Sequence, residues 1–414
     1  MNDGFLLGAF EGCGIELEYM IVDRDSLDVR PVADELLRAP GGSWSNDVER
    51  GDFGWSNELS SHLVEVKNND PRQPLATLRH GFVAEIAEIE LRLARLGARL
   101  MPGAMHPWMD PRGETRLWPH DYADIYAGYD RLFDCRRHGW ANMQSMHVNL
   151  PFHGDEEFAR LHAAIRLALP ILPALAASSP IADGAPTGYL DYRMECYRTH
   201  VARVPSMMGP VIPEPVATRA EYEARILEPI YRAVAPLDPD GAMQGEWLNA
   251  RAAIARFDRD AIEIRVLDTQ ECPWADLSIA AATVALVGSL YNGEAAAREI
   301  EDPLDSRRLA GILQSCSRGA TTALMEDADY LSRLGYPGSS CMAGELWQHL
   351  LETTLYPDPG SAAPWHEPLA NIMSRGPLAQ RILRAVGDDY RRDSLREVYG
   401  RLCRCLERGT LFEA

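Results

Sequence analysis

Several features are missing from this 414-residue chain, and each absence narrows what it can do. No apolar run approaches the ~20 residues that a membrane-spanning helix needs. Near the start, Glu11, Glu16 and Glu18 come too early for the apolar stretch of a secretion signal. We therefore expect a cytoplasmic protein that does not enter a membrane.

Positive charge is scarce. The chain has 41 Lys and Arg residues against 61 Asp and Glu residues, for a formal net charge of −20. Nucleic-acid binding relies on clustered Lys and Arg, so DNA and RNA are not expected partners. A nucleoside triphosphate remains compatible, because local Arg and bound Mg²⁺ can hold phosphates within an acidic protein. The carboxylate excess fits divalent metal, although solvated acidic side chains on helices explain it equally well.

Paired cysteine motifs are absent too. The chain has eight cysteines, but no CxxC and no paired metal-type spacing, so we interpret them as buried or idle thiols. Cys403 and Cys405 form a CxC on a predicted terminal helix, where residues two apart point to different sides. No fixed-period repeat, low-complexity tract or flexible linker divides the chain. We therefore predict a single catalytic domain over residues 1–414.

Alternating apolar and polar residues predict strands, and longer apolar stripes predict helices. The strands are expected at Ile15–Val22, Leu63–Lys67, Met146–Leu150 and Ala261–Leu267. Helices are expected at Leu75–Leu100, Glu156–Leu175, Arg219–Val234, Ala275–Asn292 and Arg307–Leu334. Beyond about residue 275 the pattern is helical, with Pro and Gly turns such as Tyr356–Gly360.

This order favours an α+β fold: a mainly antiparallel sheet flanked by helices in a core at about 10–295, with a helical C-terminal part at 296–414. A parallel α/β sheet is the alternative. Against it, these strands carry charges on one face, whereas a sheet covered on both faces shows near-continuous apolar runs.

The first predicted strand carries two carboxylates on one side. Glu16 and Glu18 project from one face, while Ile15, Leu17 and Tyr19 occupy the other. Two neighbouring like charges are costly unless they face water or a cation. A solvent-facing edge strand explains this motif as well as a metal site does.

The other strands repeat the pattern. Their polar faces carry Glu65 in the second strand, His147 and Asn149 in the third, and Glu263 and Arg265 in the fourth. Singly, each has a mundane explanation: a core histidine for His147, a structural ion pair for Glu263 with Arg265. In one antiparallel sheet, however, the polar faces would converge on a surface able to hold Mg²⁺ through oxygen ligands, with Arg neutralising phosphate.

A loop rich in hydroxyl groups and glycine offers anion-binding chemistry. It runs from Ser178 to Arg193, and its backbone amides and final guanidinium are suited to a carboxylate or phosphate. Arg251 and Arg256 precede the last strand and add positive groups, although surface arginines are often merely solvated. We predict Asn149, Tyr189 and Arg251 as substrate contacts.

At these residues the chain resembles glutamate-cysteine ligase family 2, the carboxylate-amine ligases with a glutamine-synthetase-like catalytic sheet. The resemblance runs from about residue 10 to residue 295. It is carried, in order, by Gly14-Ile15-Glu16-Leu17-Glu18, Ser61-His62-Leu63-Val64-Glu65-Val66, Met146-His147-Val148-Asn149, the Ser-Ser-Pro loop from Ser178 to Arg193, and Glu263-Ile264-Arg265-Val266-Leu267-Asp268. The family's histidine strand often has a second His where this chain has Asn149.

The resemblance implies an ATP-dependent ligase in which ATP phosphorylates a carboxylate, usually the γ-carboxylate of glutamate, before an amine attacks the acyl phosphate. It implies ATP and Mg²⁺ as cofactors, with Mn²⁺ as the alternative ion, small amino acid and amine substrates, and a homodimer. By residue matching, the metal ligands are Glu16, Glu18, Glu65, His147 and Glu263. Arg265 is then the clamp on the transferred phosphate, and Arg193 contacts the substrate carboxylate or phosphate.

Two rival functions remain at this point. One keeps the site but transfers phosphate to a guanidino or amine group. The other is a catalytically silent protein that binds a nucleotide or metabolite, which is disfavoured because all five candidate ligands are present. The sequence does not identify the amine acceptor, because specificity arises from loops that short motifs do not place.

Overall fold

The protein is described by a computed structural model covering residues 6–413, except 39–41, 240, 242, 244 and 357–362. Its main sheet has eight strands in the order β2-β3-β4-β1-β6-β10-β9, with β5 paired to β1. Among the described residues, neighbouring strands of this sheet all pair in the antiparallel sense. The strands are β1 (Gly14–Asp23), β2 (Asp47–Arg50), β3 (Phe53–Asn57), β4 (Leu63–Asn68), β5 (Ala98–Met101), β6 (Ser145–Pro151), β9 (Ala253–Arg256) and β10 (Ala261–Asp268).

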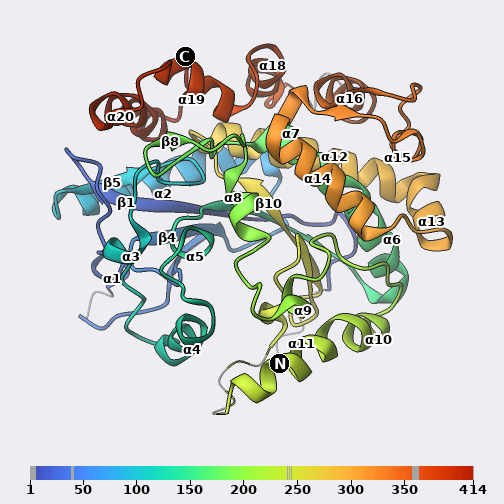
Figure 1. Ribbon diagram of the computed structural model, residues 1–414, viewed down its shortest axis with the longest axis horizontal. Coiled ribbons are helices and arrows are strands. Elements are labelled where there is room, and N and C mark those ends of the chain that lie inside the picture. The colour runs from blue at the N-terminus through green and yellow to red at the C-terminus, as the bar shows by residue number, and fades with distance from the viewer. Residues whose placement is uncertain are drawn as a thin grey trace.

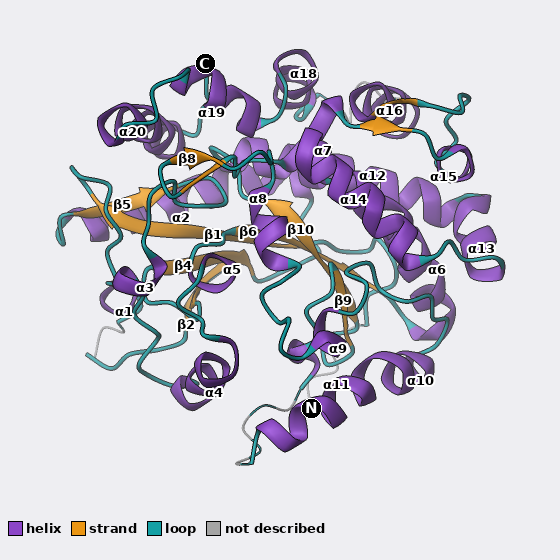
Figure 2. Cartoon of the chain, in the orientation of Figure 1, coloured by secondary structure: helices purple, strands orange, loops and turns teal. Residues whose placement is uncertain are grey.

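Helices and two small sheets surround this sheet (Figures 1 and 2). Up to residue 248 they are α1 (Ala33–Leu36), α2 (Leu75–Ala94), α3 (Pro111–Glu114), α4 (Ala123–Phe133), α5 (His138–Ala141), α6 (Gly154–Ala168), η1 (Leu169–Ile171), α7 (Pro173–Ala176), α8 (Tyr192–Tyr197), α9 (Pro205–Met208), α10 (Arg219–Tyr222), η2 (Glu223–Leu227), α11 (Glu228–Val234), η3 (Ala235–Leu237) and η4 (Glu246–Leu248). The short strands β7 (Ile181–Ala182) and β8 (Ala185–Pro186) form a hairpin within the Ser178–Arg193 loop.

The C-terminal part is almost entirely helical, as predicted. It consists of α12 (Pro273–Asn292), α13 (Glu294–Glu301), α14 (Ser306–Gly319), η5 (Ala320–Thr322), α15 (Ala328–Arg333), α16 (Ala343–Leu350), η6 (Leu351–Leu355), α18 (His366–Arg375), α19 (Leu378–Val386) and α20 (Arg392–Arg408). The exception is a small sheet of β11 (Leu324–Met325) and β12 (Cys341–Met342). The α+β prediction is confirmed, and the last strand of the main sheet ends at Asp268.

Two predicted helices are wrong in part. The Leu75–Leu100 stripe ends as α2 at Ala94, because Ala98–Met101 leaves the helix to pair with β1. The Arg307–Leu334 segment is broken after Gly319, where a turn leads into β11 before α15 begins. The predicted Pro–Gly turn after Tyr356 lies outside the described residues.

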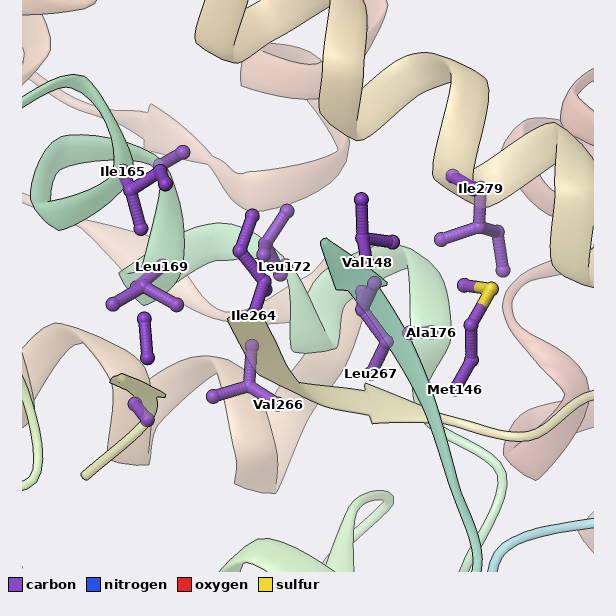
Figure 3. Close-up of a cluster of buried hydrophobic side chains, with 14 of the residues drawn as sticks. Met146, Val148, Ile165, Leu169, Leu172, Ala176, Ile264, Val266, Leu267 and Ile279 are labelled. Carbon is purple, nitrogen blue, oxygen red and sulfur yellow. The ribbon is translucent and has the colours of Figure 1, made fainter. Parts of the chain in front are cut away.

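One face of the sheet is the apolar core. Helices α2, α6, α7 and α12 contact this side, and the stripe of α2 is buried as its spacing predicts. Figure 3 shows Met146 and Val148 of β6 beside Ile264 and Leu267 of β10, packed against apolar side chains that include Ile279 of α12. Because successive side chains along a strand point to opposite faces, the polar side chains of these strands lie on the other face of the sheet.

Helix α12 corrects the reading of the sequence as free of long apolar segments. Pro273–Asn292 is long and apolar enough, by length and composition alone, to cross a membrane. In the fold, 67% of the 18-residue apolar stretch of this helix is buried, and the helix packs against α6, α2 and α18. Its hydrophobicity is therefore accounted for by core packing.

The strand register aligns the polar residues across the sheet. On β1, Glu16 lies opposite His147 of β6, and Glu18 lies opposite Glu65 of β4. On β10, Glu263 lies opposite Asn149 of β6. The polar residues of β4, β1, β6 and β10 thus share one side of four adjacent strands.

A bulge interrupts β10 at the centre of this surface. Ile264 pairs with Val148 and Leu267 pairs with Met146, so Arg265 and Val266 together face the single residue between those partners. Val266 and Leu267 both enter the apolar cluster. Because the bulge adds one residue, Asp268 returns to the polar side, opposite Ser145.

Candidate active site

The polar side of the sheet forms the floor of a cavity of about 350 Å³. Strands β1, β4, β6, β9 and β10 supply the floor, and α4, α5, α8, α9 and η4 supply the opposite wall. The structure brings together these residues predicted from sequence: Glu16, Glu18, Glu65, His147, Glu263, Arg265 and Arg193. Segments more than 240 residues apart in sequence therefore meet at one surface, as the register requires.

His147 is the central side chain of the floor. Its Nδ1 lies 2.9 Å from Glu16 Oε2 and 3.8 Å from Glu263 Oε1. Its Nε2 lies 2.9 Å from Ser145 Oγ and 3.7 Å from Glu18 Oε1. The buried imidazole of His147 thus lies close to three carboxylates, two on β1 and one on β10, which are the strands on either side of β6.

Ser145 and Ser56 hold the carboxylates from below. Glu18 Oε2 accepts hydrogen bonds from the backbone N of Ser145 at 2.7 Å and from its hydroxyl at 3.0 Å. Glu65 Oε1 accepts one from Ser56 Oγ at 2.7 Å. These bonds fix the carboxylates while leaving oxygen lone pairs available to a further ligand.

Two sets of side chains have the spacing of a metal site. Among the described residues, one ligand atom from each of Glu16, His147 and Glu263 lies within 4.8 Å of the others, and the same holds for Glu18, Glu65 and His147. The five predicted ligands therefore fall into two overlapping groups that share His147. Carboxylate oxygens and an imidazole nitrogen suit Mg²⁺ or Mn²⁺.

Cations border the carboxylates on the β9–β10 side. Arg256 Nη1 lies 3.3 Å from Glu263 Oε2, and Arg265 Nε lies 3.3 Å from Glu263 Oε1. Arg265 Nε is buried without a hydrogen-bond partner, which leaves its donor capacity unused. Because its Nε–H is not used in a hydrogen bond within the protein, the Arg265 guanidinium is suited to bind an incoming anion.

The pKa values reflect this crowding. Burial would raise the pKa of Glu16, but the bond to His147 and nearby cations lower it to about 2. Burial and the charge of Glu16 raise the pKa of Glu65 to about 7. Burial opposes protonation of His147, yet Glu16, Glu18 and Glu263 raise its pKa to about 9. Without a metal, then, protons supply part of the positive charge that the carboxylates require.

Sequence reasoning missed Glu58. This residue follows β3 and lines the cavity, and burial together with the charges of Glu18 and Glu65 raises its pKa well above the ordinary value. It lies in the connection from β3 to β4 rather than on an alternating strand, so the face argument did not reach it. The one available signal was a carboxylate directly after an apolar strand.

Arg193 has a different placement from the one its loop suggested. Its Nε lies 2.5 Å from Asp268 Oδ1, and its Nη2 donates to the carbonyl of Arg265 at 3.2 Å. Ser178 N and Ser179 Oγ both donate to Asp268 Oδ2 at 2.8 Å. The loop's hydroxyl and amide groups are thus bound to Asp268, and Arg193 reaches the cavity while supporting the bulge of β10.

The three predicted substrate contacts are not brought together. Asn149 donates to Glu16 Oε1 at 3.2 Å, at the margin of the floor. Tyr189 accepts a hydrogen bond from Arg318 at 2.7 Å, and Arg251 pairs with Glu214 at 2.6 Å. None of the three is among the described residues that line the cavity.

The chain is similar in sequence to proteins of other organisms. Over 270 residues the chain is 36% identical to an uncharacterized protein of Archaeoglobus fulgidus, a match that covers 65% of this chain and 72% of the relative. It is 27% identical over 277 residues to a Bradyrhizobium diazoefficiens protein provisionally named glutamate–cysteine ligase 2. That match covers 66% of this chain and 57% of the relative, so the chain spans less than two thirds of the relative's length.

Solved structures show the same fold at low sequence identity. A glutamate–cysteine ligase of Francisella tularensis, in complex with AMP, superposes with a TM-score of 0.60 at 12% identity, over 95% of this chain and 88% of that one. A bifunctional glutathione synthetase of Pasteurella multocida gives a TM-score of 0.54 at 12% identity, over 96% of this chain and 52% of that one. These likenesses confirm the predicted glutamine-synthetase-like fold.

The family model described as glutamate-cysteine ligase family 2 matches residues 13–401. That span contains every residue of the cavity floor and continues through the helical C-terminal part. The chain belongs to glutamate-cysteine ligase family 2.

Proposed function

We propose that this protein is an ATP-dependent carboxylate-amine ligase that activates the γ-carboxylate of glutamate, or of a similar amino acid, and joins it to an amine. The observation that carries the proposal is the cavity floor, where clustered carboxylates around His147 stand beside the free donor of Arg265. Family membership and the fold support the same reaction class.

The floor fits divalent metal. Glu16 and Glu263 with His147 would hold one ion, and Glu18 and Glu65 with His147 would border a second position. Carboxylates this crowded would repel one another in the absence of a positive charge. When bound, the metal supplies charge neutralisation at the phosphate oxygens of ATP.

The remaining work falls to the chain's own side chains. In the first step the substrate carboxylate oxygen bonds to the γ-phosphorus of ATP, and the bond from that phosphorus to ADP breaks. In the second, the amine nitrogen bonds to the acyl carbon, phosphate leaves, and the nitrogen loses a proton. We infer that Arg265 donates to the phosphoryl oxygens as their charge shifts, and that Arg193, which donates to the carbonyl of Arg265, keeps its backbone in position.

The expected partners are small amino acid and amine substrates, and we place the protein in the cytoplasm. This follows from the reaction class, because ATP and free amino acids are cytoplasmic metabolites. The net charge of −20 adds that a nucleic acid is not the substrate.

The test uses hydroxylamine as a small nucleophile that needs no acceptor pocket. Purified protein is incubated with ATP, Mg²⁺, hydroxylamine and one amino acid at a time, and ADP, phosphate and hydroxamate are measured. Glutamate-dependent hydroxamate, formed in equal amount to ADP, supports the proposal. ATP turnover that yields a stable phosphoguanidine or phosphoamine instead of hydroxamate would establish the phosphotransferase alternative, and no amino-acid-dependent turnover would reject ligase activity.

A further inference from the structure

The wall opposite the charged floor is aromatic. We define the aromatic wall as Tyr126, Tyr129, Trp140, Tyr197, His200 and Trp247, all of which line the cavity. The ring of Tyr129 lies 5.1 Å from that of Trp140 and 5.6 Å from that of Trp247. Beyond Trp140, the ring of His200 follows at 4.6 Å. With Tyr197 4.6 Å from His200, five of the six rings form one connected series of contacts.

This wall comes from elements other than the sheet. Tyr126 and Tyr129 belong to α4, Trp140 to α5, Tyr197 to α8 and Trp247 to η4. Helices α5 and α8 contact each other directly, which joins two parts of the wall. Apolar side chains that line the cavity along with the rings include Leu59, Met143, Val201, Met207 and Leu248.

The positive charges of the cavity come from five other residues, each of which lies near a carboxylate. The free Nε of Arg265 is assigned to the phosphoryl group in the proposed reaction. The pairs, by shortest contact, are Lys67 with Asp47 at 2.8 Å, Arg193 with Asp268 at 2.5 Å, Arg256 with Asp258 at 3.2 Å, Arg259 with Asp258 at 3.8 Å and Arg265 with Glu263 at 3.3 Å. Four of these cations lie on β4, β9, β10 or the β9–β10 turn. The fifth, Arg193, shares α8 with Tyr197, but its guanidinium is paired with Asp268. Among the described residues that line the cavity, the elements of the aromatic wall carry no other Lys or Arg.

His200 does not supply a positive charge either. Burial lowers its pKa to about 4, and the charge of Arg265 acts in the same direction. The imidazole also contacts the carbonyl of Tyr197 through Nδ1. None of the positions left undescribed is Lys, Arg or His in the sequence.

We propose that the aromatic wall is the acceptor subsite, and that its amine carries an aromatic or comparably large apolar group and no carboxylate. This rests on the proposed ligase function. An aromatic ring would be buried against the wall in offset or edge-to-face contact. An acceptor's carboxylate would instead leave water without a positive partner there, which is costly. Cysteine combines such a carboxylate with a side chain too small to cover the rings.

The chemistry of the second step is unchanged by this choice. The neutral amine nitrogen bonds to the acyl carbon, the carbon–oxygen bond to phosphate breaks, and the proton leaves with solvent. The wall only selects which amine is held within reach of the floor.

The test compares matched acceptors that differ by one carboxylate. With ATP, Mg²⁺ and glutamate, initial rates of amide formation are measured for phenethylamine against phenylalanine, tyramine against tyrosine, and cysteamine against cysteine. We expect kcat/KM for phenethylamine and tyramine to exceed that for each amino acid by at least about tenfold. A preference for cysteine, or for the carboxylated member of each aromatic pair, would overturn the proposal.

The reaction with hydroxylamine distinguishes failure of the acceptor proposal from failure of the ligase proposal. If glutamate hydroxamate forms at a normal rate but no aromatic amine gives an amide, the acceptor proposal fails while the ligase proposal stands. If neither product forms, both fail. Because hydroxylamine is small and uncharged, its reaction reports on activation of the carboxylate alone.

A wall variant tests the place of binding. Trp247→Leu should raise KM for phenethylamine about tenfold and KM for cysteamine by much less, since only the former spans the rings. Trp44→Leu is the matched control: Trp44 is 44% exposed, stacks on His120 and does not line the cavity, so it should change neither KM. The competing occupant of the wall is the adenine ring of ATP. If Trp247→Leu raises KM for ATP while leaving KM for phenethylamine unchanged, the wall binds nucleotide and the acceptor assignment is wrong.

Discussion

Two clusters of buried charge in this molecule have opposite character. In the helical part, Glu299 of α13 accepts from Arg166 at 3.0 Å and from Arg333 at 2.9 Å. Arg166 also donates to Ser306 Oγ at 2.8 Å and to the carbonyl of Leu304 at 2.7 Å. In the cavity, by contrast, carboxylates from three strands gather around the single imidazole of His147.

The difference indicates which buried charges are structural. In the Glu299 cluster one carboxylate is matched by two guanidinium groups, so the charges are balanced within the protein, and losing the carboxylate would destabilise the packing of α6, α13 and α15. The cavity floor is incomplete without added positive charge, which is the state expected of a site that binds metal and phosphate. Changes in the first cluster should therefore affect stability, and changes in the second should affect turnover.

The largest effect is expected from Glu299→Ala. Removing this carboxylate leaves Arg166 and Arg333 buried without their shared anion, which should cost about 3–5 kcal/mol of unfolding free energy. Turnover per folded molecule should stay near that of the unchanged protein. Urea unfolding and hydroxamate kinetics on one preparation provide the measurement. Glu301→Ala, exposed on the same helix, is the control and should change neither quantity.

Arg265→Ala should show the reverse pattern. Loss of this guanidinium removes a donor aimed at the phosphoryl group, so kcat should fall roughly a hundredfold, or ~3 kcal/mol, with a smaller effect on ATP binding. Arg265→Lys should restore little, because a point charge does not reproduce a planar, two-pronged contact. Arg232→Ala is the control, as Arg232 is 81% exposed. If Arg265→Ala lowers the melting temperature but leaves kcat unchanged, the residue is structural and the contrast between the clusters fails.

The third effect is the dependence of the unfolding free energy on pH and on bound metal. In metal-free protein the raised pKa of His147, about 9, gives stability that is complete below pH 6.5 and lost as pH rises toward 9. The raised pKa of Glu65, about 7, gives stability that is complete below pH 4.5 and lost on the way to pH 7. With EDTA, the unfolding free energy should thus fall continuously between pH 5 and pH 9.

Saturating Mg²⁺ should remove or reverse this slope, since metal displaces the protons from its ligands. Thermal unfolding across pH 5–9, with EDTA and with Mg²⁺, gives the comparison. Glu65→Gln is the matched variant, expected to flatten the metal-free curve below pH 7. A metal-free protein that grows more stable from pH 5 to pH 9 would show that the carboxylates are not crowded in the way described.

The smallest effect is expected from Asp268→Asn. This change weakens the hold of Arg193 on the bulge, so kcat should fall about tenfold, or ~1.4 kcal/mol, through displacement of Arg265. If Asp268 acts through Arg265, the double variant with Arg265→Ala should have the kcat of Arg265→Ala alone. Additive losses in the double variant would mean that Asp268 contributes to the reaction independently.

Strand alternation was enough to predict the floor of the site. Glu16, His147 and Glu263 were placed on one side because a period of two allows only two faces, and burial of the apolar face determines which is which. The same reasoning could not find Glu58 or the wall residues Tyr129 and Trp247. These lie in connections and short helices, whose positions depend on contacts far away in sequence.

Long-range pairing also explains the residues whose placement the sequence did not reveal. Arg251 pairs with Glu214, which is 37 residues away in sequence, and Arg193 pairs with Asp268, which is 75 residues away. Local pattern predicts that an Arg is present but not which carboxylate it will meet. The helix from Leu75 ended early for a similar reason, because β1 offered pairing to Ala98–Met101.

The β10 bulge changes the spacing, along the sequence, of the residues that face the polar side. In an uninterrupted strand, side chains on one face are separated by even intervals, yet Arg265 and Asp268 are three apart and both serve the polar side. Deleting Val266 would restore an even interval while every remaining cavity group kept its face. A single-codon deletion of one apolar residue would thus straighten the strand without altering any chemical group in the site.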